Sequence, residues 1–349
     1  MIPQQQTHRQ ASPDTASWQQ ALSDLVTDPR ELLALLDLDP SLLPAALLAD
    51  QDFRLRVPRA FLGRMRRGDP ADPLLRQVLP AGEETAAVPG YSGDPLAEHS
   101  HTRTPGLLQK YHGRVLVIAA GACAVNCRYC FRRHYPYGDN TPDTEQWQRL
   151  LATVAADPTI EEVILSGGDP LMVSNRRLSW ITRELAAIPH VTRLRVHTRL
   201  PVVIPARVDD ALPSILAGTR LAPVLVIHAN HANELDEDVR LAMARLAGAG
   251  ITLLNQSVLL RGVNDSADAL ADLSHRLLAC RVMPYYLHLL DRVAGAAHFD
   301  VPEAEAGVLM RKLAGRLPGY LLPRLVREIP GQPGKTPVPF AGPAEANKQ

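Results

Sequence analysis

Three cysteines lie close enough together in the sequence to bind one metal centre. Cys123, Cys127 and Cys130 have the spacing C-x3-C-x2-C, whereas the fourth cysteine, Cys280, stands far from them. Structural zinc sites usually draw four ligands from paired C-x2-C motifs, and iron–sulfur clusters are held by cysteine thiolates, normally four of them. Three thiolates leave one iron of a [4Fe–4S] cluster open to another molecule. The spacing therefore favours an iron–sulfur cluster with an open iron over zinc.

A second residue that could do chemistry is Lys335, in the segment VREIPGQPGKTPVPF. Gly331, Gly334 and the prolines around them predict a tight, exposed turn. Composition alone favours an ordinary surface lysine at this place. A lysine beside glycines can also let a planar cofactor approach closely, and lysine Schiff bases hold pyridoxal phosphate (PLP). The residues alone leave both interpretations open.

Alternating apolar and amphipathic runs predict the elements that position these residues. Strands are predicted at 114–121, 161–166, 192–197, 223–228, 251–259 and 281–289. Helices are predicted after them at 143–156, 176–187, 208–217, 234–248, 266–278 and 301–315. Such alternation predicts a parallel sheet with right-handed crossovers. Six units are fewer than the eight of a closed TIM barrel, so an open partial barrel and a doubly wound sheet both fit.

The chemically distinctive residues come directly after the predicted strands. The cysteine cluster follows the first strand, SGGDP the second, HTR the third, HAN the fourth and LLD the sixth. In parallel α/β folds the carboxyl ends of the strands carry the active site. We therefore expect these motifs to line one site. Cys280 ends a predicted helix before the sixth strand, at the wrong end of the barrel for a fourth ligand, and is expected to be a buried core residue.

The rest of the chain gives weaker signals. Residues 1–18 are polar and are predicted to be disordered, and short helices are predicted at 17–26, 29–36, 40–49 and 57–68. Residues 81–106 are rich in glycine and proline and are interpreted as a connector. The expected organisation is a tail at 1–18, a helical region with connector at 19–106, a barrel at 107–317 and a lysine-bearing segment at 318–349.

Composition excludes several classes of protein. Lys and Arg together number 37, as do Asp and Glu, so the formal net charge is zero. Nucleic-acid and membrane-surface binders carry a basic excess, so neither partner is expected. Four cysteines are too few for a disulfide framework in 349 residues. Neither a targeting segment nor an apolar run of roughly 20 residues is visible, so the protein is expected in the cytoplasm.

The motif CAVNCRYC resembles the signature of the radical S-adenosylmethionine (radical SAM) superfamily. The resemblance implies that Cys123, Cys127 and Cys130 hold a [4Fe–4S] cluster whose open iron binds SAM. The glycine-rich turn that contacts SAM in that superfamily matches Gly167, Gly168 and Asp169, and a further SAM-side position matches His228 more loosely. On its own, Gly-Asp-Pro also makes an ordinary turn, and a single histidine is as often structural.

Ordered motifs over residues 100–340 resemble the lysine 2,3-aminomutase family more narrowly. They are CRYCFRRHYPYG, SGGDPL, HTRLPVVIP, NQSVLLRGVND, MPYYLHLLDRVAGAAHF and PGQPGKTPV. The resemblance implies an α/β fold, a partial (β/α)6 TIM-like barrel of radical SAM type, preceded by a mainly helical region. It also implies an isomerase that converts (S)-α-lysine to (R)-β-lysine with three cofactors, a [4Fe–4S] cluster, SAM and PLP.

The same resemblance implies a role for each matching residue. Lys335 would hold PLP covalently and is the expected catalytic residue, and the PLP phosphate would lie near Tyr111 and Arg114. The substrate would be bound by Arg132 at its α-carboxylate and by Asp291 at its ε-ammonium, beside Glu328 and Gln256. Two acids facing a distal amine favour lysine over glutamate as the substrate. Structural alternatives stay open for two positions: Arg114 as a strand cap and Gln256 in a buried polar pair.

One branch of the family matches best. The 349-residue chain ends 14 residues after Lys335, without the further cysteines of the catabolic enzymes, and carries REIPGQPGK. These features resemble the aminomutase of elongation factor P β-lysylation, which implies a link to elongation factor P and its lysine ligase. A homo-oligomer stays open. The alternatives are a catabolic lysine 2,3-aminomutase acting on free lysine, a PLP-independent radical SAM enzyme and a non-catalytic redox sensor.

Overall fold

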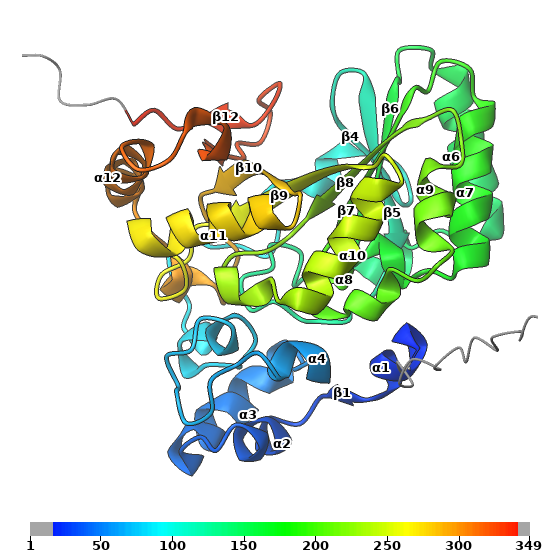
Figure 1. Cartoon of the computed structure of the whole chain (residues 1–349). Helices are drawn as coiled ribbons and strands as arrows, with labels where there is room; N and C mark the ends of the chain where they lie inside the picture. The colour runs from blue at the N-terminus through cyan, green and yellow to red at the C-terminus, as the bar shows by residue number, and fades with distance from the viewer. Residues whose placement is uncertain (1–16, 341–349) are drawn as a thin grey trace, which may run out of the picture.

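One continuous sheet organises the computed structural model, which describes residues 17–340 (Figure 1). Within those residues the sheet has ten strands in the order β12-β11-β10-β9-β8-β7-β6-β5-β4-β3. Strands β5 to β11 are parallel to one another. At the edges, β3, β4 and β12 run antiparallel to their neighbours. The predicted partial barrel is therefore confirmed, and its sheet is open because β3 and β12 form separate edges.

Each parallel strand is joined to the next through a helix that covers the outside of the sheet (Figure 1). The strands are β5 (Arg114–Ala120), β6 (Glu162–Gly167), β7 (Arg193–Thr198), β8 (Ala222–Ile227), β9 (Thr252–Val258), β10 (Met283–His288) and β11 (Arg324–Arg327). The main helices are α6 (Thr144–Ala156), α7 (Asn175–Ala187), α9 (Leu212–Ala217), α10 (Glu237–Gly248), α11 (Ala267–Ala279) and α12 (Glu303–Ala314). The six predicted strand and helix pairs are all present.

Local sequence explains where these helices begin. Asp143, Ser174, Asp236 and Ser266 precede α6, α7, α10 and α11, and each side chain accepts an amide of the first turn. Such a cap stabilises a helix by about 1 kcal/mol. The helix predicted at 208–217 is shorter than expected, because the Asp209 carboxylate accepts the amides of Ala211 and Leu212 in a turn before α9.

Four strands of the ten-stranded sheet were absent from the prediction. These are β3 (Thr102–Thr104), β4 (Leu107–Tyr111), β11 and β12 (Thr336–Pro337). Short strands at the edge of a sheet carry little periodicity, so the pattern does not reveal them. The expected boundary between 317 and 318 needs correction, because β11 pairs in parallel with β10 and belongs to the barrel sheet. The connector likewise ends in β3, which pairs with β4.

The N-terminal region contains α1 (Trp18–Ser23), α2 (Pro29–Leu35), α3 (Leu43–Asp52) and α4 (Arg59–Leu62). The helices predicted at 17–26 and 57–68 were too long, because β1 (Leu25–Val26) pairs with β2 (Val57–Pro58). The predicted disordered tail lies outside the described residues except for its last two positions. Those positions are corrected, since Ser17 caps α1 and Trp18 is buried.

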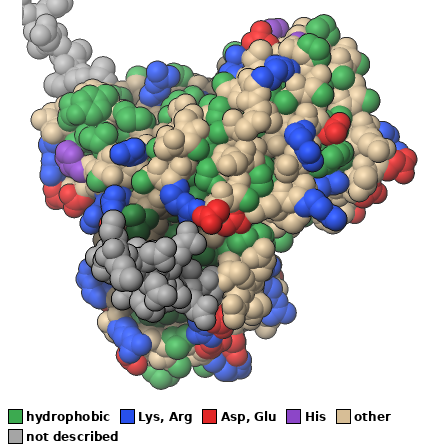
Figure 2. Space-filling view, turned by 45° about the vertical axis from the view of Figure 1, so that its right-hand side comes forward, with side chains coloured by type: hydrophobic (Ala, Val, Ile, Leu, Met, Phe, Trp, Pro, Cys, Tyr) green, Lys and Arg blue, Asp and Glu red, His purple; other side chains and the backbone are tan. Residues whose placement is uncertain are grey.

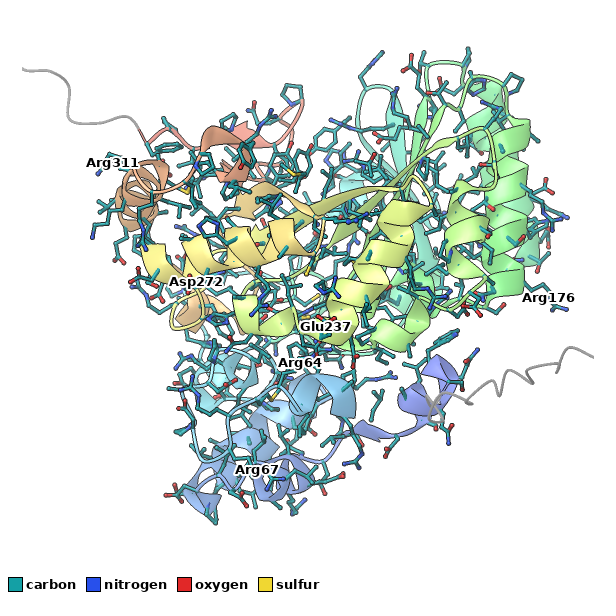
Figure 3. All side chains as sticks on the ribbon, viewed as in Figure 1. Arg64, Arg67, Arg176, Glu237, Asp272 and Arg311 are labelled. Carbon is teal, nitrogen blue, oxygen red and sulfur yellow. The ribbon has the colours of Figure 1, made fainter. Side chains whose placement is uncertain are left out.

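The N-terminal region packs against the barrel as part of one hydrophobic core. A single cluster of buried side chains extends from Trp18 to Val282 and includes both regions. Arg64 lies at their junction, as Figure 3 shows. Its guanidinium bonds Asp236 Oδ2 at 2.6 Å, Val202 O at 2.6 Å and Glu234 O at 2.8 Å. The N-terminal helices therefore cover the end of the barrel where strands β7 and β8 finish.

Two further expectations can be compared with the structure. Cys280 follows α11 directly and is buried in the core, as predicted. On the face drawn in Figure 2, cationic and anionic side chains are interspersed, in keeping with their equal numbers in the sequence. Among residues 17–340, none of the helices is both long enough and apolar enough to cross a membrane.

Candidate active site

A cavity of about 290 Å³ lies between the parallel strands and the loops that follow them. Its wall contains all the residues that the sequence predicted for the site, although these come from segments spread over more than 220 positions of the chain. They are Tyr111, Arg114, Cys123, Cys127, Cys130, Arg132, Gly167, Gly168, Asp169, His228, Gln256, Asp291, Glu328 and Lys335. The structure thus brings the predicted residues together, while their individual roles remain predictions.

The cysteines lie on the loop after β5, and the glycine-rich turn after β6 packs directly against that loop. The amide of Gly168 donates to Ala120 O at 2.8 Å and the amide of Asp169 to Ala122 O at 2.9 Å. A Cβ atom at Gly168 would lie 2.4 Å from Ala122 O, closer than any side chain tolerates. Gly167 has φ +119°, a conformation that favours glycine. These two glycines therefore allow the turn to approach the cysteine loop.

The donor set on this loop fits an iron–sulfur cluster. Cys123, Cys127 and Cys130 are free, half-buried thiols on the wall of one cavity. Among residues 17–340 no three His, Cys, Asp or Glu side chains form a group that could hold a metal ion. Cysteines of a cluster bind separate irons and need not converge on one point. Burial raises the pKa of Cys123, and raises that of Cys130 to about 11, so a bound cation is needed to keep these thiols deprotonated.

The carboxylate of Asp169 is occupied by hydrogen bonds within the protein. Its buried carboxylate accepts bonds from Thr198 Oγ1 at 2.6 Å, Arg199 N at 2.7 Å and Leu200 N at 2.8 Å. It also accepts the amide of Leu171 at 3.0 Å. Burial raises the pKa of Asp169, and these four donors oppose that effect. The carboxylate ties the turn after β6 to the start of the loop after β7.

In another part of the cavity wall, Lys335 is paired with Glu328. Lys335 Nζ donates to Glu328 Oε2 at 2.6 Å, and the hydroxyl of Tyr111 donates to the other carboxylate oxygen. Lys110 Nζ lies 3.9 Å from Glu328 Oε1. Burial raises the pKa of Asp291, the charge of Lys335 lowers it and that of Glu328 raises it, with a net result of about 7. Two acids thus lie near one amine, a geometry suited to binding an ammonium group.

Arg132 forms an ion pair with Glu98, a residue that the sequence analysis did not identify. Its Nε lies 2.7 Å from Glu98 Oε2 and its Nη2 lies 2.9 Å from Glu98 Oε1. Burial opposes ionisation of Glu98, but Arg132 and Lys110 outweigh it and lower the pKa to about 2. The third donor of the fork, Nη1, bonds Ser166 Oγ at 3.2 Å and Gly167 O at 3.4 Å. The fork expected for a substrate carboxylate therefore offers mainly this third donor.

The middle of the cavity fits a phosphorylated aromatic cofactor. Within residues 17–340, Arg114 Nε and Arg195 Nε are buried without a hydrogen-bond partner, and both side chains line the cavity. Arg195 Nη2 is paired with Glu162 Oε2 at 2.7 Å, so the unused donors are the two Nε atoms, and a phosphate group accepts such donors. The ring of Tyr286 lies 5.8 Å from Lys335 Nζ. These residues fit PLP held by Lys335.

Three histidines form another part of the wall. Burial lowers the pKa of His228 to about 3 and lowers those of His197 and His288 well below the ordinary value, so all three are neutral. Gln256 Nε2 lies 2.8 Å from His228 Nε2. His197 begins the motif HTR, which was expected to line the site, whereas His288 and Arg195 were missed by the sequence analysis. Their alternation with outward residues along predicted strands was the available signal.

The comparisons with known proteins agree with this geometry. The family model of the radical SAM superfamily matches residues 117–273, from β5 into α11. This chain, whose open parallel sheet carries three cysteines after its first parallel strand, is therefore a radical SAM enzyme.

Named relatives narrow the class further. The L-lysine 2,3-aminomutase of Escherichia coli is 54% identical over 328 residues, which cover 94% of this chain and 96% of that protein. That of Haemophilus influenzae is 47% identical, covering 92% of this chain and 95% of that protein. That of Clostridium subterminale is 36% identical, covering 82% and 69%. The chain belongs to the lysine 2,3-aminomutase family of isomerases.

Proposed function

We propose that this protein converts (S)-α-lysine to (R)-β-lysine with a [4Fe–4S] cluster, SAM and PLP. The observation that carries the proposal is the distribution of charge along one cavity. The Arg132 guanidinium lies near the cysteine loop, paired with Glu98 but with Nη1 directed at Ser166. Two carboxyl groups, Asp291 and Glu328, lie near Lys335. A molecule with a carboxylate at one end and an ammonium at the other matches that distribution.

The cofactors and the chain have separate tasks in this proposal. When bound, the cluster and SAM supply a deoxyadenosyl radical that removes a hydrogen atom, and PLP carries the migrating amine. The chain holds the substrate so that its Cβ faces the radical. Arg132 Nη1 and Ser166 would hold the carboxylate, and Asp291 and Glu328 the ε-ammonium. Fixing both ends lowers the entropic cost of reaching the reactive geometry.

The test is product analysis with purified protein. The protein would be reconstituted anaerobically with iron, sulfide and PLP, and then incubated with dithionite, SAM and (S)-α-lysine. We expect (R)-β-lysine on chiral chromatography, and no rearranged product from glutamate under the same conditions. A protein that cleaves SAM but leaves lysine unchanged would contradict the substrate. One that cleaves SAM without binding PLP would favour the PLP-independent alternative.

We further propose that the product serves, in the cytoplasm, to modify elongation factor P through a lysine ligase. The support is sequence resemblance, in the segment REIPGQPGK that ends at Lys335. Co-expression with elongation factor P and its ligase tests this. The intact mass of the factor should increase by one β-lysyl group only when the aminomutase is active. An unchanged mass with abundant free β-lysine would favour a catabolic role.

A further inference from the structure

A buried arginine outside the assigned roles contacts the cysteine loop directly. Arg199 follows β7 and is only 6% exposed. Its Nη1 donates to Cys127 Sγ at 2.7 Å and to the Tyr129 hydroxyl at 2.7 Å. No function proposed above uses this side chain.

The rest of the guanidinium is fixed by two residues on the side away from the thiol. Nη2 donates to Gln77 Oε1 at 2.8 Å and to Glu234 Oε2 at 2.9 Å. Both partners are fully buried, at 0% exposure. The backbone amide of Arg199 in turn donates to Asp169 Oδ2 at 2.7 Å. The arginine is therefore held in one orientation and connects the turn after β6 with the cysteine loop.

Gln77 brings the N-terminal region into this arrangement. Its backbone carbonyl accepts the amide of Arg128, beside Cys127, at 2.9 Å. Its side-chain amide donates to Glu234 Oε1 at 3.1 Å, and its side-chain oxygen also accepts Asn230 Nδ2 at 3.0 Å. One residue of the N-terminal region thus fixes both the loop that carries the thiol and the arginine that contacts it.

A cation bonded to a cluster ligand has an electronic consequence. A cluster held by three thiolates becomes more negative when it gains an electron. Hydrogen bonds to the ligand sulfurs and nearby charge are among the factors that set the reduction potential of such clusters, and a buried charge is poorly screened. Arg199 therefore stabilises the reduced cluster more than the oxidised one. Glu234 offsets part of this effect, but it lies on the far side of the guanidinium from the thiol.

We propose that Arg199 is a positioning residue for the cluster, which orients Cys127 and raises the reduction potential, with Gln77 and Glu234 holding its guanidinium in place. The proposal rests on the assignment of the cluster to the three cysteines. It does not depend on lysine as the substrate.

The test is the midpoint potential of the reconstituted cluster, followed by electron paramagnetic resonance during redox titration. We expect Arg199→Gln to shift the potential to more negative values and Arg199→Lys, which keeps the charge but not the fork, to shift it less. Arg64→Gln is the matched control, because Arg64 bonds the same loop at Glu234 O but contacts no cysteine. Its potential should stay at the wild-type value.

The outcomes separate this proposal from the others. An unchanged potential in Arg199→Gln with an intact cluster would overturn it, as would an equal shift in Arg64→Gln. If Arg199→Gln fails to fold, the double variant Arg199→Gln/Glu234→Gln, which leaves no unpaired buried charge, carries the same expectation of a negative shift. A wild-type protein that assembles no [4Fe–4S] cluster would instead contradict the cluster assignment itself.

Discussion

Lys335 and Glu328 form an ion pair within the cavity, with Nζ 2.6 Å from Oε2. Lys335, which is proposed to hold PLP, is therefore paired with Glu328, which is proposed to bind the ε-ammonium of lysine. Attachment of Lys335 to a cofactor withdraws its ammonium charge from Glu328. The carboxylate then becomes available to a second ammonium group. In the proposed function, Glu328 would therefore be shared between Lys335 and the distal amine of the substrate.

Substitution of Lys335 provides the first prediction. Lys335→Ala removes the amine that we assign to PLP, so the absorbance of lysine-linked PLP should be lost while the iron content stays at the wild-type level. Lys312→Ala is the control, since Lys312 lies exposed on α12, away from the cavity. Covalently bound PLP in Lys335→Ala, detected by borohydride trapping and mass spectrometry, would refute the assignment.

Asp291 is expected to act on lysine and not on SAM. Asp291→Asn keeps the size of the side chain but removes one charge facing the ammonium group. A hydrogen bond to a charged group contributes about 1.5–3 kcal/mol, so KM for lysine should rise by roughly 10-fold to 100-fold. KM for SAM should change by less than about twofold. Steady-state kinetics at pH 8 measure both, and equal effects on the two substrates would move Asp291 out of the substrate site.

The same residue predicts a pH dependence. Burial raises the pKa of Asp291 to about 7, so the carboxyl group is ionised above that pH and neutral below it. An ionised carboxylate attracts the ammonium group of lysine. KM for lysine should therefore increase as the pH falls from 8 to 6. In Asp291→Asn this step should disappear, and a step that persists in the variant would have to come from another group.

Gly168 predicts a structural requirement next to the cysteines. A methyl group there would lie 2.4 Å from the backbone oxygen of Ala122, and a backbone atom cannot move aside as a side chain can. Gly168→Ala should therefore push the turn from the cysteine loop and lower the iron content after reconstitution. Gly248→Ala is the control, because no atom lies within 4 Å of the added methyl group. Normal iron content in both variants would show that the close contact is dispensable.

The buried pair of Glu98 and Arg132 predicts a large effect on stability. Removing one partner of a buried ion pair costs about 3–5 kcal/mol, so Glu98→Gln should unfold at a clearly lower urea concentration. Glu145→Gln is the matched control on α6, where the pair with Arg149 is exposed. An exposed pair of this spacing contributes about 0.3–0.5 kcal/mol. Equal midpoints for the two variants in equilibrium unfolding would contradict the structural role of Glu98.

Much of the site followed from local sequence patterns. The six strand and helix pairs have clear periodicity, and the chemically distinctive residues follow strands, so their convergence in one cavity was predictable. Glu98 was not found, and Arg199 was expected at the site only as part of the motif HTR, without its contact to Cys127. Glu98 lies in a segment without periodicity, and its partner Arg132 is 34 positions away. Arg199 contacts Cys127 and Gln77, 72 and 122 positions away. Such pairings are decided by tertiary packing, which local sequence propensity does not predict.

In the N-terminal region, tertiary pairing produced strands where the local sequence predicted helix. Residues 57–68 have helical spacing, yet Val57 and Pro58 pair with Leu25 and Val26 in a small sheet. A pairing between segments 30 residues apart overrides the local preference. The short strand β11 was missed for a related reason, because its place beside β10 is set by the preceding helix α12 and not by its own four residues.

The strands of the sheet follow one another in chain order, so the parts of the site are also synthesised in that order. A ribosome completes the cysteine loop about two hundred residues before it reaches Lys335, and domains tend to fold as they emerge. Glu328 and Lys335 follow β11, which joins the sheet beside β10 only after six parallel strands have been made. Until then the cavity lacks one wall. The two charged residues Glu328 and Lys335 are therefore among the last parts of the cavity wall to be synthesised, and the three cysteines are among the first.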